Sequence, residues 1–233
     1  MFGLVCDRAA EEPRERVAEG VRFYAVYVTG GDTLRARLSQ RAAARKLARR
    51  GVRAAVLLAK NIDRAVLIKH GVVPISAVPL YRATAAAIVR RYLAQEGLAP
   101  RNTTLAFVAE HVTRELYRAI GALSADVRYL SLCAPGGAAL ASRLQRERGV
   151  AVRQCGEGST RADLTVAFDG TAAEGAVLRL DDTLCVTYDS SYPNELLTAL
   201  WRVGTLDADK LTVLSVSTAE SQEKSCKMPQ LPV

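Results

Sequence analysis

The stretch that decides the fold is residues 21–51, which read VRFYAVYV, TGGD, TLRARLSQRAAARKLARR and G. Residues 21–28 are rich in β-branched and aromatic side chains and predict a strand that ends at Thr29-Gly30-Gly31. Asp32 can then cap a helix that continues until Gly51 stops it. The stretch is therefore a strand, a turn and a helix.

The same alternation continues along the chain. Further strands are expected at residues 52–58, 72–76, 103–109, 127–133 and 150–154, and helices at 62–69, 80–95, 112–123 and 138–148. Strands joined by helices of this length imply right-handed crossovers and a mostly parallel sheet. The later strand-like runs are joined by shorter segments, which favours antiparallel pairing at one edge: 164–168, 176–180 and 184–187. A helix at 194–203 and a strand at 211–216 follow. The predicted fold class is α/β and Rossmann-like, with a mixed or antiparallel edge toward the C-terminus.

Positive charge is concentrated in one segment. Residues 21–101 hold 16 Lys or Arg and 3 Asp or Glu, whereas the rest of the chain is slightly acidic. The change of sign coincides with GLAPRN at residues 97–102, which is the best candidate boundary. We therefore expect two lobes, a basic one at 1–98 and a Rossmann-like one at 99–217, followed by a flexible tail at 218–233. One continuous sheet is the alternative.

Composition and missing motifs exclude several classes of protein. A chain that is 49% hydrophobic and 24% charged is too apolar to be disordered, yet no apolar run reaches the roughly 18 residues of a spanning helix. Residues 1–6 lack the basic start of a secretory signal. Five widely spaced cysteines without a C-x-x-C pair argue against a disulfide framework, and two distant histidines argue against zinc. The sequence also contains no P-loop and no G-x-S-x-G motif. We expect a cytoplasmic protein with no metal and no membrane partner.

Four arginines form a stripe on the first long helix. They recur at every fourth residue, at Arg37, Arg41, Arg45 and Arg49. The stripe could follow a phosphate backbone, but the aromatic side chains that stack on single strands are scarce here, so a nucleic-acid partner is not favoured. A solvated helix face opposite Leu34, Leu38 and Leu47 is the favoured explanation, and a surface that docks on an acidic partner is the other alternative.

A glycine turn in the second half carries a resemblance. Residues 129–152 read YLSLCAPGGAALASRLQRERGVAV, in which Gly136 and Gly137 lie between a strand and a helix. This stretch of about 40 residues, extended through ADLTVAFD, resembles the NAD(P)-binding domain of shikimate-dehydrogenase-type proteins. The resemblance implies a cofactor pyrophosphate, from NAD or NADP, over Gly136 and Gly137. Ala134 stands where that family has its first glycine, and a structural strand-to-helix turn is the other interpretation.

Two further loops follow predicted strands and are candidate ligand positions. Gly30 and Gly31 allow close approach of an anion, although Asp32 would repel a phosphate, and an ordinary turn explains them too. His111 is one of two histidines and is a weak candidate for a general base; a helix-cap or surface position is the alternative.

The sequence alone does not specify the function. Our first hypothesis is a protein that binds a small anionic or nucleotide-like ligand at the carboxyl ends of its strands. The second is a non-catalytic scaffold whose basic lobe meets an acidic partner, and the third is a degenerate NAD(P)-dependent oxidoreductase. No catalytic machinery is identifiable, and the oligomeric state is unknown.

Overall fold

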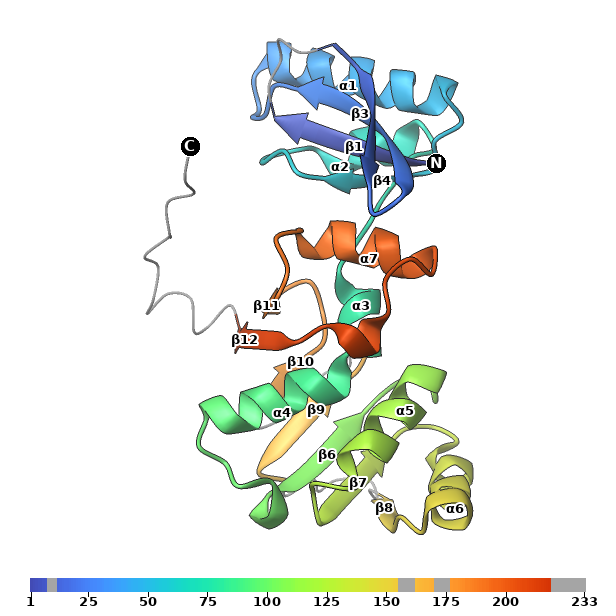
Figure 1. Cartoon of the computed structure of the whole chain (residues 1–233), viewed down its shortest axis with the longest axis vertical. Coiled ribbons are helices and arrows are strands. Elements are labelled where there is room, and N and C mark those ends of the chain that lie inside the picture. Colours follow the sequence, from blue (N-terminus) through green and yellow to red (C-terminus); the bar gives the residue numbers. More distant parts are fainter. Residues whose placement is uncertain (8–11, 155–161, 170–176, 219–233) are drawn as a thin grey trace. The chain divides into compact units, whose positions relative to one another are not determined.

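The computed structural model describes residues 1–7, 12–154, 162–169 and 177–218 (Figure 1). By their contacts, residues group into two compact units. The first unit comprises Met1–Leu80 with Ser190–Lys210, and the second comprises Tyr81–Asp189 with Leu211–Val233. The sequence-based lobes 1–98 and 99–217 stay a prediction about folding domains. Of the expected tail, residues 219–233 lie outside the described ranges.

The first unit is built on a mixed five-stranded sheet, sheet A, in the order β2-β3-β1-β4-β5. Its strands are β1 (Phe2–Asp7), β2 (Arg14–Ala18), β3 (Val21–Val28), β4 (Ala54–Leu57) and β5 (Val73–Pro74). β1 pairs in parallel with β3 and β4, whereas β2 pairs antiparallel with β3. Glu19 and Gly20 join β2 to β3 with positive φ angles of 47° and 75°, as a two-residue hairpin requires. We had not predicted β1 or β2.

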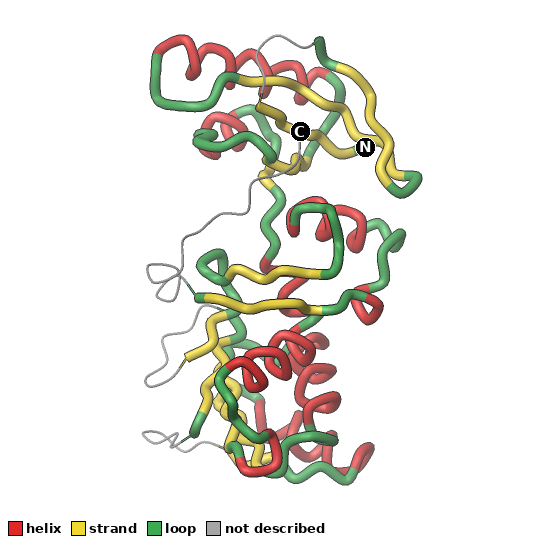
Figure 2. Tube along the Cα trace, turned by 60° about the vertical axis from the view of Figure 1, so that its left-hand side comes forward, coloured by secondary structure: helices red, strands yellow, loops and turns green. Residues whose placement is uncertain are grey.

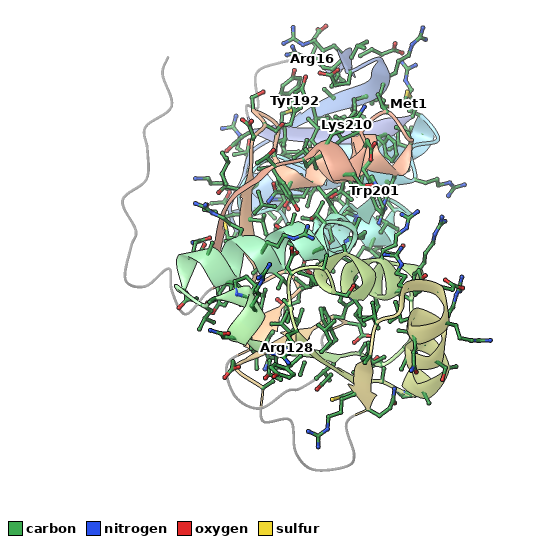
Figure 3. The ribbon with its side chains drawn as sticks, turned by 60° about the horizontal axis from the view of Figure 1, so that its bottom comes forward. Met1, Arg16, Arg128, Tyr192, Trp201 and Lys210 are labelled. Carbon is green, nitrogen blue, oxygen red and sulfur yellow. The ribbon has the colours of Figure 1, made fainter. Side chains whose placement is uncertain are left out.

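Helices cover both faces of sheet A. On one face lie α1 (Leu34–Arg49) and α2 (Arg64–Lys69), whose buried Leu47 and Leu67 join a core with Val5 and Val26. On the other face lies α7 (Asn194–Arg202), whose residues pack on the opposite sides of the strands. The segment that contains α7 carries Tyr192 and Trp201, labelled in Figure 3, and the Tyr192 hydroxyl group donates to Glu19 Oε1 at 3.2 Å. One face of sheet A is therefore covered by a helix that is distant from the sheet in sequence.

The second unit is built on a fully parallel sheet, sheet B, in the order β10-β9-β6-β7-β8. Its strands are β6 (Thr104–Val108), β7 (Tyr129–Cys133), β8 (Val152–Gln154), β9 (Leu164–Ala167) and β10 (Val177–Arg179). Its helices are α4 (Ala85–Gln95), α5 (Arg114–Leu123) and α6 (Gly137–Arg148), of which α5 packs between the other two (Figure 1). In Figure 2 helices are red and strands yellow. The Rossmann-like α/β class predicted from the sequence is confirmed by this topology.

Some local predictions need correction. A small antiparallel sheet does form toward the C-terminus, from β11 (Cys185–Tyr188) and β12 (Val213–Ser217). β10, however, pairs in parallel with β9, because the direction of pairing is set by packing in the whole sheet and not by the length of one connection in the sequence. The helix expected at 80–95 is two helices, α3 (Val78–Ala83) and α4, separated at Thr84.

The structure also bears on the cysteines and on membrane-spanning helices. Cys133 is disulfide-bonded, although the spacing of cysteines had argued against disulfides; pairing depends on how close two Cα atoms come in the fold. Cys155 and Cys226 lie outside the described residues. Among the described residues, no helix is long and apolar enough to cross a membrane.

Candidate functional site

The strand order of sheet B defines the place where a Rossmann-like sheet usually binds its ligand. The chain runs from β6 through β7 to β8 on one side, and then returns to β9 and β10 on the other side of β6. Ligands bind outside the carboxyl ends of the strands where this order reverses. Here that position lies between the ends of β6 and β9, which are followed by Glu110, His111 and Asp169.

In this protein a carboxylate from the chain itself occupies that position. The backbone N–H group of Glu110 donates to both carboxylate oxygens of Asp169, at 2.9 and 2.8 Å, and that of His111 donates at 3.2 Å. These N–H groups lie in the loop between β6 and α5, at the strand end where a Rossmann-like sheet would accept a ligand. The negative charge of Asp169 also repels a phosphate. The structure therefore disfavours anion binding between β6 and β9.

The described residues around His111 do not form a catalytic arrangement with its imidazole. Its side chain is exposed, and within the described part of the chain its imidazole makes no hydrogen bond. Its helix is capped by Thr113, whose hydroxyl oxygen accepts from the Leu116 N–H group at 3.2 Å. A general base must reach the proton that it removes. The role of His111 as a general base stays a prediction.

The turn with Gly136 and Gly137 follows β7, one strand away from the point where the order reverses. Gly136 caps α6 with a φ of 74°, a conformation that favours glycine. Gly137 is buried, and a Cβ atom there would lie 3.2 Å from Leu132 Cδ2 and 3.3 Å from Gln154 Oε1. The backbone conformation of Gly136 and the close packing at Gly137 therefore explain why both residues are glycine. Cofactor binding at this turn stays a prediction.

The Gly30-Gly31 loop is held against the end of β4. A Cβ atom on Gly30 would lie 2.5 Å from the carbonyl oxygen of Lys60, and the Gly31 N–H group donates to the carbonyl oxygen of Asn61 at 3.3 Å. The buried Gln40 side chain joins the same two loops, because its Nε2 donates to the Gly31 carbonyl oxygen at 3.5 Å and its Oε1 accepts from the Asp63 N–H group at 3.1 Å. Close contact between two loops thus explains the glycines.

The cap of the following helix differs from our prediction. Thr33, not Asp32, caps α1, and its hydroxyl oxygen accepts from the Ala36 N–H group at 3.2 Å. Either side chain can cap a helix, and the one that lies within reach of the first free N–H groups does so.

Positive side chains line a groove between α5 and α6 in the second unit. Its volume is about 510 Å³. Four arginines and one tyrosine are among its lining residues: Arg114, Tyr117 and Arg118 from α5, and Arg143 and Arg148 from α6. Val112, Thr113 and Leu140 complete the lining. We call it the α5–α6 groove.

Glu147 fixes two of these side chains. The Tyr117 hydroxyl group donates to Glu147 Oε2 at 2.6 Å, and Arg143 Nε donates to Glu147 Oε1 at 2.8 Å. The hydrogen bond from Tyr117 and then that from Arg143 lower the pKa of Glu147, so Glu147 is a carboxylate at neutral pH. The pairing with Glu147 in turn raises the pKa of Arg143. Arg143 uses its Nε in this pair, which leaves its terminal N–H groups for a ligand.

Tyr117 and Gly121 position the guanidinium groups of Arg143 and Arg148. The guanidinium carbons of Arg143 and Arg148 lie 4.9 and 5.4 Å from the centre of the Tyr117 ring, within the range of a cation–π interaction. Arg148 also crosses the backbone of Gly121, since a Cβ atom there would lie 2.6 Å from its terminal nitrogen. Within the described ranges, Arg114, Arg118 and Arg148 form no ion pair with a carboxylate. Three positive charges in the groove are therefore not neutralised by the described residues.

We did not single out this groove from the sequence. The pairs Arg114 with Arg118 and Arg143 with Arg148 lie on different helices, and each pair alone is typical of an exposed helix face. The arginines of α1 are likewise exposed: Arg37, Arg41, Arg45 and Arg49. That they form a binding surface stays a prediction. The prediction that Leu34 and Leu38 face the core is wrong. They are 76% and 55% exposed, and α1 packs instead through Ala36, Gln40, Ala43, Ala44 and Leu47.

Comparisons with known proteins add little to this geometry. No protein family profile and no curated protein sequence matches the chain. Similar solved structures are the ornithine carbamoyltransferases of Pyrococcus furiosus (16% identity, TM-score 0.27, 71% of this chain and 58% of that chain) and Burkholderia thailandensis (17%, 0.28, 71% and 61%). Another is L-tryptophan dehydrogenase from Nostoc punctiforme, at 14% identity and a TM-score of 0.29, with 64% of this chain and 44% of that chain covered. This chain thus spans less than two thirds of the length of these enzymes. Such scores carry no argument about function.

Proposed function

We propose that this protein binds a small anionic ligand of the phosphate or nucleotide class in the α5–α6 groove. The observation that carries the proposal is the arginine cluster around Tyr117, of which Glu147 neutralises one member. Guanidinium groups offer paired N–H donors that match the oxygens of a phosphate, and their charge strengthens each hydrogen bond. The groove therefore supplies both charge and geometry for a phosphate.

The groove is a better position than the strand ends that we first considered. Asp169 already occupies the N–H groups between β6 and β9, and the Gly136-Gly137 turn has structural reasons of its own. The part of the ligand that the groove recognises is its anionic group. A NAD- or NADP-dependent reaction ranks below simple binding, because the glycine pattern of that family is incomplete at Ala134.

The proposal concerns binding and not catalysis. The described lining offers hydrogen-bond donors and positive charge, and it contains no cysteine, histidine or lysine that could act as a nucleophile or base. A preorganised arginine cluster lowers the cost of ordering side chains when the ligand binds. Glu147 would provide that order.

The test is titration calorimetry and thermal shift with inorganic phosphate, pyrophosphate, ADP, NAD and NADP. The variant Arg114→Gln with Arg118→Gln removes two exposed guanidinium groups that hold no described partner. We expect it to weaken binding by about a hundredfold or more, because each of the two charge-assisted hydrogen bonds contributes about 1.5–3 kcal/mol. A ligand present at about 100 times its Kd should stabilise the wild-type protein by about 2.7 kcal/mol.

The matched control is Arg128→Gln. Arg128 is an exposed arginine of the same unit that lies over the Tyr129 ring, with a distance of 5.4 Å to its centre. It should leave binding unchanged. If no probe binds the wild-type protein, or if both variants bind equally well, the groove is not the anion site.

A further inference from the structure

The outer face of α1 carries leucines at positions where a solvated helix would carry polar side chains. At about 100° per residue, Leu34 and Leu38 lie on the side of the helix opposite to the buried Ala36, Ala43 and Leu47. Their exposed fractions are 76% and 55%. Packing within the described part of the chain therefore does not explain these two leucines.

Arginines surround this pair of leucines. On the same helical projection, Arg41 and Arg45 continue the line of Leu34 and Leu38, and the other arginines of the helix flank this line. The helix contains no Asp or Glu, so none of these charges is balanced within it. We call this surface the outer face of α1.

The neighbouring helix carries a similar combination of side chains. α2 contacts α1 and presents an exposed Ile68, 57% accessible, between exposed Arg64 and Lys69. Two adjacent helices thus present the same combination, in which protruding aliphatic side chains stand among basic ones.

We propose that the outer face of α1, together with α2, binds the surface of a membrane that contains anionic lipids. Aliphatic side chains on a helix that lies in the plane of the interface enter the boundary between headgroups and acyl chains. Long basic side chains beside them extend to the lipid phosphates, and each gains from the negative surface potential. From the sequence we expected no membrane partner because no segment can span one, but attachment to the surface needs no spanning segment.

Other partners fit this face less well. A second copy of the same face would bring like charges together. A nucleic acid would pair with the arginines but would leave Leu34 and Leu38 in water, and α1 has no aromatic side chain on which bases could stack. A protein partner usually presents aromatic anchors and pockets to its target, whereas this face consists of protruding aliphatic groups on a convex helix. A lipid surface accommodates such protrusions without a preformed pocket.

The test is co-sedimentation of the full chain with vesicles of phosphatidylcholine alone or of phosphatidylcholine mixed with phosphatidylglycerol. Wild-type protein should bind the mixed vesicles at low salt and lose binding as salt is added, because charges at the surface are screened. The variant Leu34→Ser with Leu38→Ser should lower the partition coefficient by about tenfold or more. In the wild-type protein, both leucine side chains leave water when the protein binds the vesicle, and the variant loses this contribution. Both leucines are exposed, so the variant should keep the wild-type melting temperature.

The control variant is Leu214→Ser, which alters a leucine that is 45% exposed on β12. It should bind the mixed vesicles as wild type does. Absence of wild-type binding at low salt would overturn the proposal. Unchanged vesicle binding by the Leu34 and Leu38 variant would also overturn it. So would a DNA duplex that competes with the vesicles and binds wild type and this variant equally. Either of these two results would show that the face recognises negative charge alone.

Discussion

Tyr188 lies in the core of the second unit with 3% of its surface exposed, and its hydroxyl oxygen lies 2.7 Å from Thr84 Oγ1. Burial raises the pKa of Tyr188, with a smaller contribution from Tyr81, although the hydrogen bond with Thr84 opposes the shift. The folded state therefore keeps the phenol proton at a pH where the unfolded chain has lost it. The unfolded state then binds fewer protons, so stability falls as pH rises.

We predict that the free energy of unfolding decreases above about pH 10, by up to about 1.4 kcal/mol per pH unit from this one group. Urea unfolding at a series of alkaline pH values measures the slope. Tyr188→Phe should flatten it, and Tyr129→Phe, at a half-exposed position, should not. An equal slope in wild type and in Tyr188→Phe would contradict the assignment.

At the scale of elements, the second unit shows how a helix can complete a sheet edge. Gln95, the last residue of α4, donates from Nε2 to the carbonyl oxygen of Val216 at 3.2 Å and accepts from its N–H group at Oε1 at 2.9 Å. The side-chain amide thus pairs with β12 in the manner of a neighbouring strand. This contact satisfies two backbone groups on the edge of a two-stranded sheet, which would otherwise be marginally stable.

We predict that Gln95→Glu destabilises the second unit by about 1–3 kcal/mol, because a carboxylate cannot donate to the Val216 carbonyl group and brings a charge beside it. Chemical denaturation measures the change. Arg91→Ala, an exposed substitution on the same helix, serves as the control and should stay within about 0.5 kcal/mol of wild type. If Gln95→Glu is as stable as the control, the amide does not hold β12.

At the scale of the whole molecule, each unit has its own sheet and its own buried residues. Units of this kind can unfold separately. We predict two transitions in calorimetry, each sensitive to a different substitution. Gly30→Ala would press a methyl group against the Lys60 carbonyl oxygen in the first unit, and Asp169→Ala would leave the N–H groups of Glu110 and His111 unpaired in the second.

Each substitution should lower one midpoint by several degrees, as expected for a loss of about 1–3 kcal/mol. The other midpoint should not move. A single transition that both substitutions lower equally would show that the units unfold as one.

The sequence was sufficient where the signal is local. The periodicity that predicted β3, α1, α5 and α6 belongs to neighbouring residues, and the structure confirms these elements. It was insufficient for β1, whose six residues form a strand in the middle of sheet A only because β3 and β4 pair with it on either side. The candidate glycines were identified as turn residues, but what each one contacts, such as the Lys60 carbonyl group beside Gly30, depends on a distant loop.

By itself, then, the sequence determined the α/β class, the order of most strands and helices, and the basic character of α1. The tertiary structure alone decided that Asp169 takes the N–H groups after β6, that four arginines from α5 and α6 surround one groove, and that Leu34 and Leu38 face outward. The physical reason is that periodicity arises from adjacent residues. Convergence of side chains, and the choice of which helix face is buried, arise from the packing of segments that are far apart in the chain.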